Sequence, residues 1–361
     1  MKSERADREA GFSLIESLLA LTLLLVVMAA VFGLVNPSSI ASRTQPEAVD
    51  VQQRARVAAD ALQRDLMMAG AGLTSGPATG PINSFFPAVI PRRMGLKGAD
   101  PYQVARTDVI TLYRAAPGHV QTTLRDPMAQ GALSLTVNDA ANCPVRNGVC
   151  GLAPDMTIVV FDQAGQFDWF TVGQIQNPVV SLQTHQNGLA SAYPAGSFVA
   201  AAESDTYWHD PSARQLRHYD GYQTDVPVAD NVVGLSFEYF GDPDPPTRPK
   251  PPVGATNCLY DAGGNLVAGL TQLGAQGSLA PLPLSILTDG PWCGAGDNRF
   301  DADLLRVRSI RVTLRIQATQ SAHRGTGPDY ANPGAARTAL KIVPDYSAPF
   351  IVTPRNLGLG R

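Results

Sequence analysis

Residues 11–36 read GFSLIESLLALTLLLVVMAAVFGLVN, and this stretch decides how the rest of the sequence is interpreted. From Phe12 to Val35 the run carries a single charged side chain, that of Glu16. At about 1.5 Å of rise per residue, a helix of this length spans ~36 Å, enough to cross the ~30 Å hydrocarbon core of a bilayer. The sequence therefore predicts a membrane-spanning helix near the N-terminus.

Two ordinary explanations of this run stay open. A secretory signal peptide has a shorter apolar core followed by a small-x-small cleavage site, whereas this run is long and ends at residues 36–39, NPSS; the alanines of residues 28–30, MAA, keep cleavage as an alternative. The second explanation is an uncleaved single-span anchor. Three basic residues in the polar leader, Lys2, Arg5 and Arg8, favour a cytoplasmic N-terminus.

Glu16 is the feature that neither explanation accounts for. A carboxylate in a membrane helix costs about 2.5–3.5 kcal/mol at the helix centre and less near the end, and it often marks a functional position. The structural alternative is a glutamate that snorkels to the headgroups.

Residues 11–16, GFSLIE, resemble the prepilin cleavage and methylation motif of type IV pilins and type II secretion pseudopilins. The resemblance implies that a prepilin peptidase cuts after Gly11, that the new N-terminal Phe12 is N-methylated, and that Glu16 supports assembly. One departure is that the bases of the leader are balanced by three acids, whereas leaders in this family are usually net basic.

A second helix is expected after the apolar run. Pro37 is expected to kink or end the first helix, and Gly70 and Gly72 to stop the second. Residues 53–70 resemble the corresponding helix end of PilW-type minor pilins and J-type pseudopilins. Apolar residues recur there at spacings of three and four, which predicts one buried face: Val51, Ala55, Ala58, Leu62, Leu66 and Ala69.

The remainder is expected to be rich in β-structure, because most of the 33 Gly and 29 Pro lie after residue 70. Residues 71–106 are expected to form a long surface connection. Two strands near 231–240 and 304–316 are expected to be neighbours, with Val233, Leu235, Phe237 and Tyr239 on one face of the first and a bulge near Ser309 in the second. Further strands are expected at 108–113, 131–137, 157–161 and 167–172, the last two as a hairpin.

The predicted fold class is α+β: a pilin-like roll in which a long N-terminal helix packs on an antiparallel sheet, with disulfide-held loops. The expected organisation is a leader at 1–11, a transmembrane and assembly helix at 12–36, its periplasmic continuation at 37–70, and a β-rich periplasmic domain at 71–361 with a long loop insertion at 241–300.

Four cysteines fall into two local groups C-terminal to the apolar run. In an exported domain, the natural interpretation is two disulfides, Cys143 with Cys150 and Cys258 with Cys293. A zinc site is the rival, but the sequence contains no C-x-x-C pair and no histidine at ligand spacing beside either group.

Catalytic signatures are absent from the sequence: there is no G-x-S-x-G elbow, no P-loop and no H-E-x-x-H. Five scattered histidines favour structural roles, and a net charge of −3 predicts no obligate nucleic-acid ligand. No cofactor is expected; Asp297, Asp301 and Asp303 are weak calcium candidates, with Asx turns as the alternative.

The resemblance implies a non-catalytic minor pilin or pseudopilin of the priming or tip complex. It is expected in the inner membrane, N-terminus cytoplasmic and C-terminal domain periplasmic, and then in a type IV pilus or type II secretion pseudopilus. Its expected partners are prepilin peptidase, other major or minor pilins or pseudopilins, the inner-membrane assembly platform and the lipid bilayer. The alternative is a membrane-anchored periplasmic enzyme or binding protein with a fortuitous leader.

Overall fold

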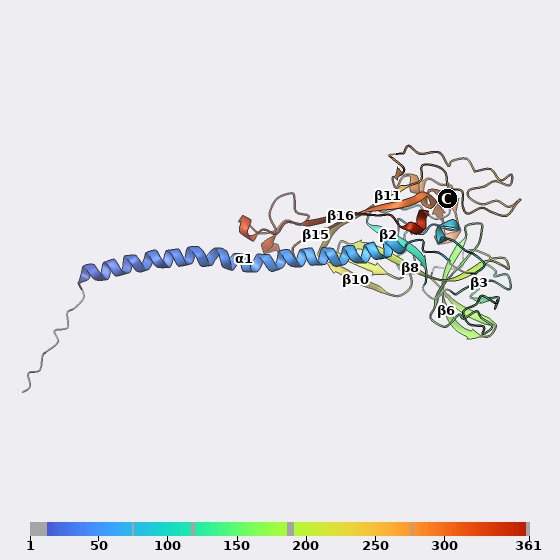
Figure 1. The fold of residues 1–361 in the computed structure, drawn as a ribbon, viewed down its shortest axis with the longest axis horizontal. Helices are drawn as coiled ribbons and strands as arrows, with labels where there is room; N and C mark the ends of the chain where they lie inside the picture. The colour runs from blue at the N-terminus through green and yellow to red at the C-terminus, as the bar shows by residue number, and fades with distance from the viewer. Residues whose placement is uncertain (1–12, 74–75, 117–119, 186–190, 276, 359–361) are drawn as a thin grey trace, which may run out of the picture. The chain divides into compact units, whose positions relative to one another are not determined.

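A computed structural model describes residues 13–73, 76–116, 120–185, 191–275 and 277–358 (Figure 1). The chain divides into two compact units. The first contains Met1–Val51 with Ala318–Asp345, and the second contains Gln52–Gln317 with Tyr346–Arg361.

One long helix, α1, runs from Leu14 to Met68. The helix passes through Pro37 and Pro46 without ending, so an end of the first helix at Pro37 is wrong, and the kink expected as the alternative stays a prediction. The physical reason is that a proline removes only its own N–H from the hydrogen-bond ladder, and the turns on either side can continue.

The C-terminal part of α1 buries the face that the sequence predicts. Val51, Ala55, Ala58, Leu62, Leu66 and Ala69 are all buried, which confirms the helical periodicity. Gly70 then adopts a φ of +72°, a conformation that suits glycine after a helix end, and its N–H donates to the Tyr113 carbonyl at 2.9 Å.

Among the described residues, the larger sheet has ten strands, and each pairing in it is antiparallel. Its main path is β1-β2-β8-β5-β6-β7-β4; β3 and β9 also pair with β8, and β10 pairs with β9. The strands are β1 (Val89–Ile90), β2 (Val109–Ala115), β3 (Gln121–Thr123), β4 (Ser134–Thr136), β5 (Thr157–Phe161), β6 (Phe167–Gln176), β7 (Val179–Thr184), β8 (Phe198–Asp210), β9 (Gln215–Tyr219) and β10 (Asp225–Asp230). The predicted hairpin of 157–161 with 167–172 is confirmed as β5 and β6.

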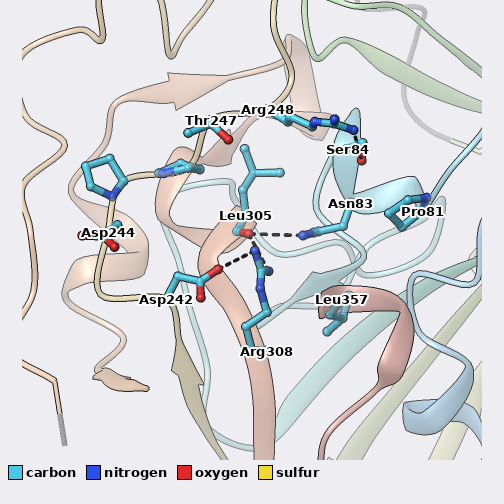
Figure 2. A pocket seen from close by; sticks show the side chains of 12 residues that line it. Pro81, Asn83, Ser84, Asp242, Asp244, Thr247, Arg248, Leu305, Arg308 and Leu357 are labelled. Atoms are coloured by element: carbon cyan, nitrogen blue, oxygen red, sulfur yellow. Dashed lines mark hydrogen bonds and ion pairs between the residues drawn. The ribbon is translucent and has the colours of Figure 1, made fainter. Parts of the chain in front are cut away.

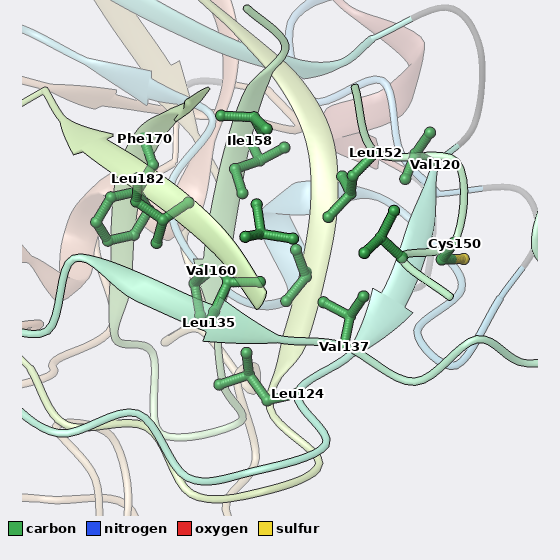
Figure 3. Close-up of a cluster of buried hydrophobic side chains, with 14 of the residues drawn as sticks. Val120, Leu124, Leu135, Val137, Cys150, Leu152, Ile158, Val160, Phe170 and Leu182 are labelled. Carbon is green, nitrogen blue, oxygen red and sulfur yellow. The ribbon is translucent and has the colours of Figure 1, made fainter. Parts of the chain in front are cut away.

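A core cluster fills the end of this sheet formed by β4 to β8. Ile158, Val160 and Phe170 are fully buried there (Figure 3). Cys150 belongs to the same cluster, so the first disulfide closes its loop directly against the core.

The second sheet has the order β12-β11-β15-β16, with strands β11 (Val232–Gly241), β12 (Ala280–Leu282), β15 (Val307–Ile316) and β16 (Tyr346–Val352). The expected pairing of β11 with β15 is confirmed and is antiparallel. Phe240 pairs with Ser309 and Gly241 with Val307, so the predicted bulge near Ser309 is confirmed. A second register shift, between Val232 and Gly234, buries Val232 in the position expected for Val233, which corrects that detail.

The expectation of a surface connection at 71–106 is wrong. This segment contains η1 (Ile82–Ser84) and β1, and several of its side chains are buried. Arg92 is 2% exposed and donates to the backbone carbonyls of Tyr102, Asp297 and Arg299. Burial lowers the pKa of Arg92 to about 10.

The insertion at 241–300 is more ordered than a long loop. It contains β12, η2 (Ile286–Thr288), β13 (Trp292–Cys293), η3 (Gly296–Asn298) and the start of β14 (Phe300–Asp301), which pairs with β13. Arg306, 1% exposed, lies in η4 (Ala302–Arg306) and donates to the carbonyls of Pro243 and Thr271 at 3.0 and 2.8 Å. The buried Arg306 side chain therefore fixes the insertion through two of its backbone carbonyl groups. Short helical turns η5 (Ser321–His323), η6 (Ala339–Lys341) and η7 (Arg355–Gly358) complete the fold.

Both predicted disulfides are present. Cys143–Cys150 joins Cα atoms 4.9 Å apart between β4 and β5, and Cys258–Cys293 joins Cα atoms 5.0 Å apart across the insertion. The helix, the antiparallel sheets and the two disulfides together confirm the α+β, pilin-like fold class.

Candidate functional site

The apolar part of α1 is the most exposed hydrophobic surface among the described residues. It covers Leu14–Leu34, 21 residues of which none is buried within the structure. Length and composition are sufficient for a membrane crossing, and apolar side chains in such a run need lipid or other helices to cover them.

Glu16 has a local role at the start of this helix. Its Oε2 accepts a hydrogen bond from the backbone N–H of Ser13 at 3.0 Å, and the Ser13 Oγ accepts one from the N–H of Ile15 at 3.2 Å. This arrangement is a capping box in which the Ser13 hydroxyl accepts from the N–H of Ile15, one position before Glu16; both contacts satisfy N–H groups that have no partner inside the helix. The pattern S-x-x-E at residues 13–16 signals such a box, and the sequence analysis did not use it.

Gly11 and Phe12, the predicted cleavage and methylation positions, lie outside the described residues. The first described residue, Ser13, carries the N–H that Glu16 accepts. Ser13 directly follows Phe12 in the chain, so Glu16 accepts from the residue next to the predicted methylation position.

The calcium candidates are only partly brought together. Asp301 and Asp303 meet Asp289, with one carboxylate oxygen of each within 4.8 Å of the others, and Asp297 is not in this group. Burial raises the pKa of Asp301 to about 6 and that of Asp303 to about 7. Asp303 pairs with Arg306 at 2.6 Å. These contacts give both buried carboxyl groups structural roles, and calcium binding stays a prediction.

A cavity of about 270 Å³ lies beside the start of the insertion (Figure 2). In its wall Asp242 pairs with Arg308 at 2.7 Å, so these two charges neutralise one another. The Asn83 side chain donates to the Leu305 carbonyl at 3.2 Å. The described residues that line the cavity include neither histidine nor cysteine. Asp242, Arg308 and Asn83 direct their polar groups at other residues of the wall.

Each of the four described histidines contacts a side chain or a backbone carbonyl of the protein. His119 lies outside the described residues. His185 is buried, its Nε2 lies 2.7 Å from the Thr171 hydroxyl, and its ring stacks on Tyr222. Burial lowers the pKa of His185 to about 4. His209 and His323 lie against backbone carbonyls.

His218 belongs to a polar network that fixes α1 on the larger sheet. Burial opposes its protonation, but the hydrogen bond from His218 to Asp205, at 2.7 Å, and the Asp205 charge raise its pKa overall. Arg114 links Asp205 at 2.9 Å to Asp65 of α1 at 3.0 Å, and the Tyr207 hydroxyl also donates to Asp65. No pattern in the sequence marks this network, because its members come from α1 and from strands that are distant in the chain.

Comparison with known families finds one match at the N-terminus. Residues 7–32 match the model described as the prokaryotic N-terminal methylation motif. The chain carries a prepilin-type N-terminus. No curated protein and no solved structure matches the chain. The matched residues contain the capping box and most of the apolar run, so the motif coincides with the uncovered surface of α1.

Proposed function

We propose that this protein is a non-catalytic minor pilin or pseudopilin, cleaved by prepilin peptidase after Gly11, N-methylated on Phe12 and assembled through α1. The observation that carries the proposal is the coincidence of the methylation motif at residues 7–32 with an apolar helix that no other described part of the chain covers. The large, disulfide-held body supports a minor subunit at the priming or tip complex. Before assembly, the protein is anchored in the inner membrane with its body in the periplasm.

Glu16 has two separable tasks under this proposal. As a capping-box residue it needs only an acceptor oxygen, which glutamine also provides. As an assembly residue it needs a negative charge, because a charged amine on Phe12 of a neighbouring subunit must be neutralised in a dry helix bundle. The charge and the acceptor can therefore be tested one at a time.

The test compares Glu16→Gln with Glu16→Ala in cells that have an active prepilin peptidase. We expect both variants to be inserted and cleaved, and both to be recovered poorly in sheared filaments, because both lack the charge. Mature mass, membrane retention and filament recovery are the measurements. If Glu16→Gln assembles as well as the parent, the capping box is the whole role of Glu16 and the charge-pairing argument is wrong.

Gly11→Leu is the matched change at the cut, because it adds bulk at the cleavage position and leaves the helix unchanged. We expect this variant to keep its leader and to remain in the membrane. A parent chain that keeps residues 1–11 in the same cells would overturn the pilin proposal and favour a simple membrane anchor.

A further inference from the structure

A small hollow lies in the second unit, beside the larger sheet. The rings of Trp169 in β6 and of His185, which directly follows β7, form part of its wall, and Ser204 of β8 lies in the wall as well. All three residues are more than nine-tenths buried. About 10 Å³ of the hollow is open to the centre of a water molecule, which is room for one water and for no larger ligand.

Two nitrogen atoms of these rings have no hydrogen-bond partner among the described residues, Trp169 Nε1 and His185 Nδ1. Both atoms are buried, and a buried polar atom that loses water without gaining a partner destabilises the fold. The other ring nitrogen of His185 is already used, because Nε2 lies 2.7 Å from the Thr171 hydroxyl. The ring also stacks on Tyr222 with 4.6 Å between the centroids, so its position is fixed on two sides.

Strand register brings the two rings together. Phe170 of β6 pairs with Thr184 of β7, so the next pair along the ladder places Trp169 opposite His185. The His185 N–H donates to the Trp169 carbonyl at 3.0 Å, which extends the ladder to this pair. Residues directly opposite each other put their side chains on the same face of a sheet, with Cβ atoms about 5 Å apart. One water molecule can therefore reach both rings.

Backbone closes another part of the wall. Gly95 and Gly221 both line the hollow and have φ angles of +108° and +82°. The Leu96 N–H donates to the Gly221 carbonyl at 3.0 Å, and a Cβ on Gly95 would lie 2.4 Å from that carbonyl oxygen. Neither glycine therefore offers a side chain that could fill the hollow or supply a polar group to the two nitrogens.

The two unpartnered nitrogens determine which ligand fits. The indole N–H of Trp169 is a donor only, so the ligand must accept a hydrogen bond from it. Burial lowers the pKa of His185 to about 4, so at neutral pH its ring is uncharged and does not attract an anion. The indole N–H opposes a cation, and the clusters of three metal-ligating side chains among the described residues lie elsewhere. Water is small and uncharged, and it can accept from Trp169 while it donates to or accepts from His185.

We propose that this hollow is a binding site for one ordered water molecule, which accepts a hydrogen bond from Trp169 Nε1 and bonds to Nδ1 of His185. The water adds a side-chain bridge to the backbone bond between the same two residues, where the β6–β7 ladder ends. It is a structural ligand of the β-rich body, and it does not depend on the proposed anchoring or assembly of α1.

The experiment is NMR spectroscopy of the full chain in detergent micelles at neutral pH, with the indole nitrogens of tryptophan isotopically labelled. The sequence has 3 tryptophans, so the indole signal that Trp169→Phe removes belongs to Trp169. We expect cross-relaxation between this indole proton and the water resonance, with the sign that separates a bound water from chemical exchange. His185→Phe should abolish the peak, because the larger apolar ring removes the second partner and narrows the hollow. His209→Phe is the matched control and should keep the peak, since His209 lies against the Val232 carbonyl.

Two results would overturn the proposal. A Trp169 indole proton without this peak, or with a peak of the exchange sign only, would mean that no bound water meets the indole N–H. A peak of equal strength in His185→Phe would show a water held without His185, so the bridge would be wrong. If His185→Phe does not fold, the parent decides, because the carbon-bound Hε1 proton of the His185 ring lies beside Nδ1 and does not exchange with water. This proton should show the same cross-relaxation, and its absence would contradict the bridge.

Discussion

We expect His185 to lower the stability of the protein in mild acid. Its ring is buried beside Thr171 and Tyr222, and its folded-state pKa of about 4 lies below the ~6.5 of an unfolded chain. The unfolded state therefore takes up a proton first, and stability is lost as the pH falls from about 6.5 towards 4. Between pH 7 and pH 5 the loss is about 2 kcal/mol.

The measurement is chemical denaturation of the parent and of His185→Gln at pH 7 and pH 5. Glutamine can keep a hydrogen bond to the Thr171 hydroxyl but does not titrate in this range. Asp301 and Asp303, whose pKa values are raised by burial, push the pH dependence in the opposite direction, and they are present in both proteins. If the two proteins lose equal stability between these pH values, His185 is not the acid-sensitive group.

Glu16 and Arg92 show which features of single residues can be predicted from the sequence and which cannot. Glu16 was identified as special because a charge in an apolar run is unusual, but its contact with Ser13 required the helix start to be known. The burial of Arg92 could not be predicted, because its partners are the backbone carbonyls of Tyr102, Asp297 and Arg299. Every residue has a backbone carbonyl, so such an acceptor cannot be recognised from residue type.

At the scale of elements, the two disulfides should differ in what they contribute. The Cys143–Cys150 bridge closes a loop with a sequence separation of 7, and the Cys258–Cys293 bridge one with a separation of 35. In the chain-entropy account, these loops correspond to about 2.5 and about 4 kcal/mol respectively. Replacing each pair by serine and measuring the free energy of unfolding should therefore show the larger loss for Cys258 with Cys293.

Removal of the Cys258–Cys293 bridge should affect the insertion more than the larger sheet. Cys258–Cys293 spans the insertion that Arg306 also holds, so its loss should increase proteolysis between residues 258 and 293 while leaving the larger sheet folded. A larger loss for the Cys143–Cys150 pair would mean that packing of Cys150 in the core cluster, and not loop entropy, decides the contribution.

Periodicity predicted the elements whose one face is buried. The helical face from Val51 to Ala69 and the bulge near Ser309 follow from apolar spacing, because the apolar residues at that spacing are buried in both elements. The register shift that buries Val232 in place of Val233 could not be predicted from the apolar pattern, since both residues are valine. The sequence predicts a loop for the insertion because its strands are two or three residues long, too short to show a period.

At the scale of the whole molecule, the division into two units runs through α1 and changes where a soluble fragment should begin. The apolar run of spanning length, Leu14–Leu34, precedes residue 40, so a fragment that begins near residue 40 lacks it. The structure adds that Thr44 and Glu47 belong to the same unit as Ala318–Asp345, the 318–345 loop between β15 and β16, whereas the second unit starts at Gln52. A cut at residue 52 removes the helical partner of this loop.

We predict that fragments 40–361 and 52–361 both express without detergent but differ in the 318–345 loop. Arg324 is buried within this loop and is a trypsin site that cleaves only when the loop opens. Loss of the Glu47 acceptor and of the surface around Thr44 removes contacts that hold the loop closed, so trypsin should cut after Arg324 faster in 52–361 than in 40–361. Glu47→Ala in 40–361 is the matched variant, because it deletes the acceptor for the Thr319 N–H and keeps the helix, and it should give an intermediate rate. Peptide mass measured over time after trypsin addition provides the rates. Equal cleavage after Arg324 in all three proteins would show that the loop is held by its own hydrogen bonds alone and does not depend on α1.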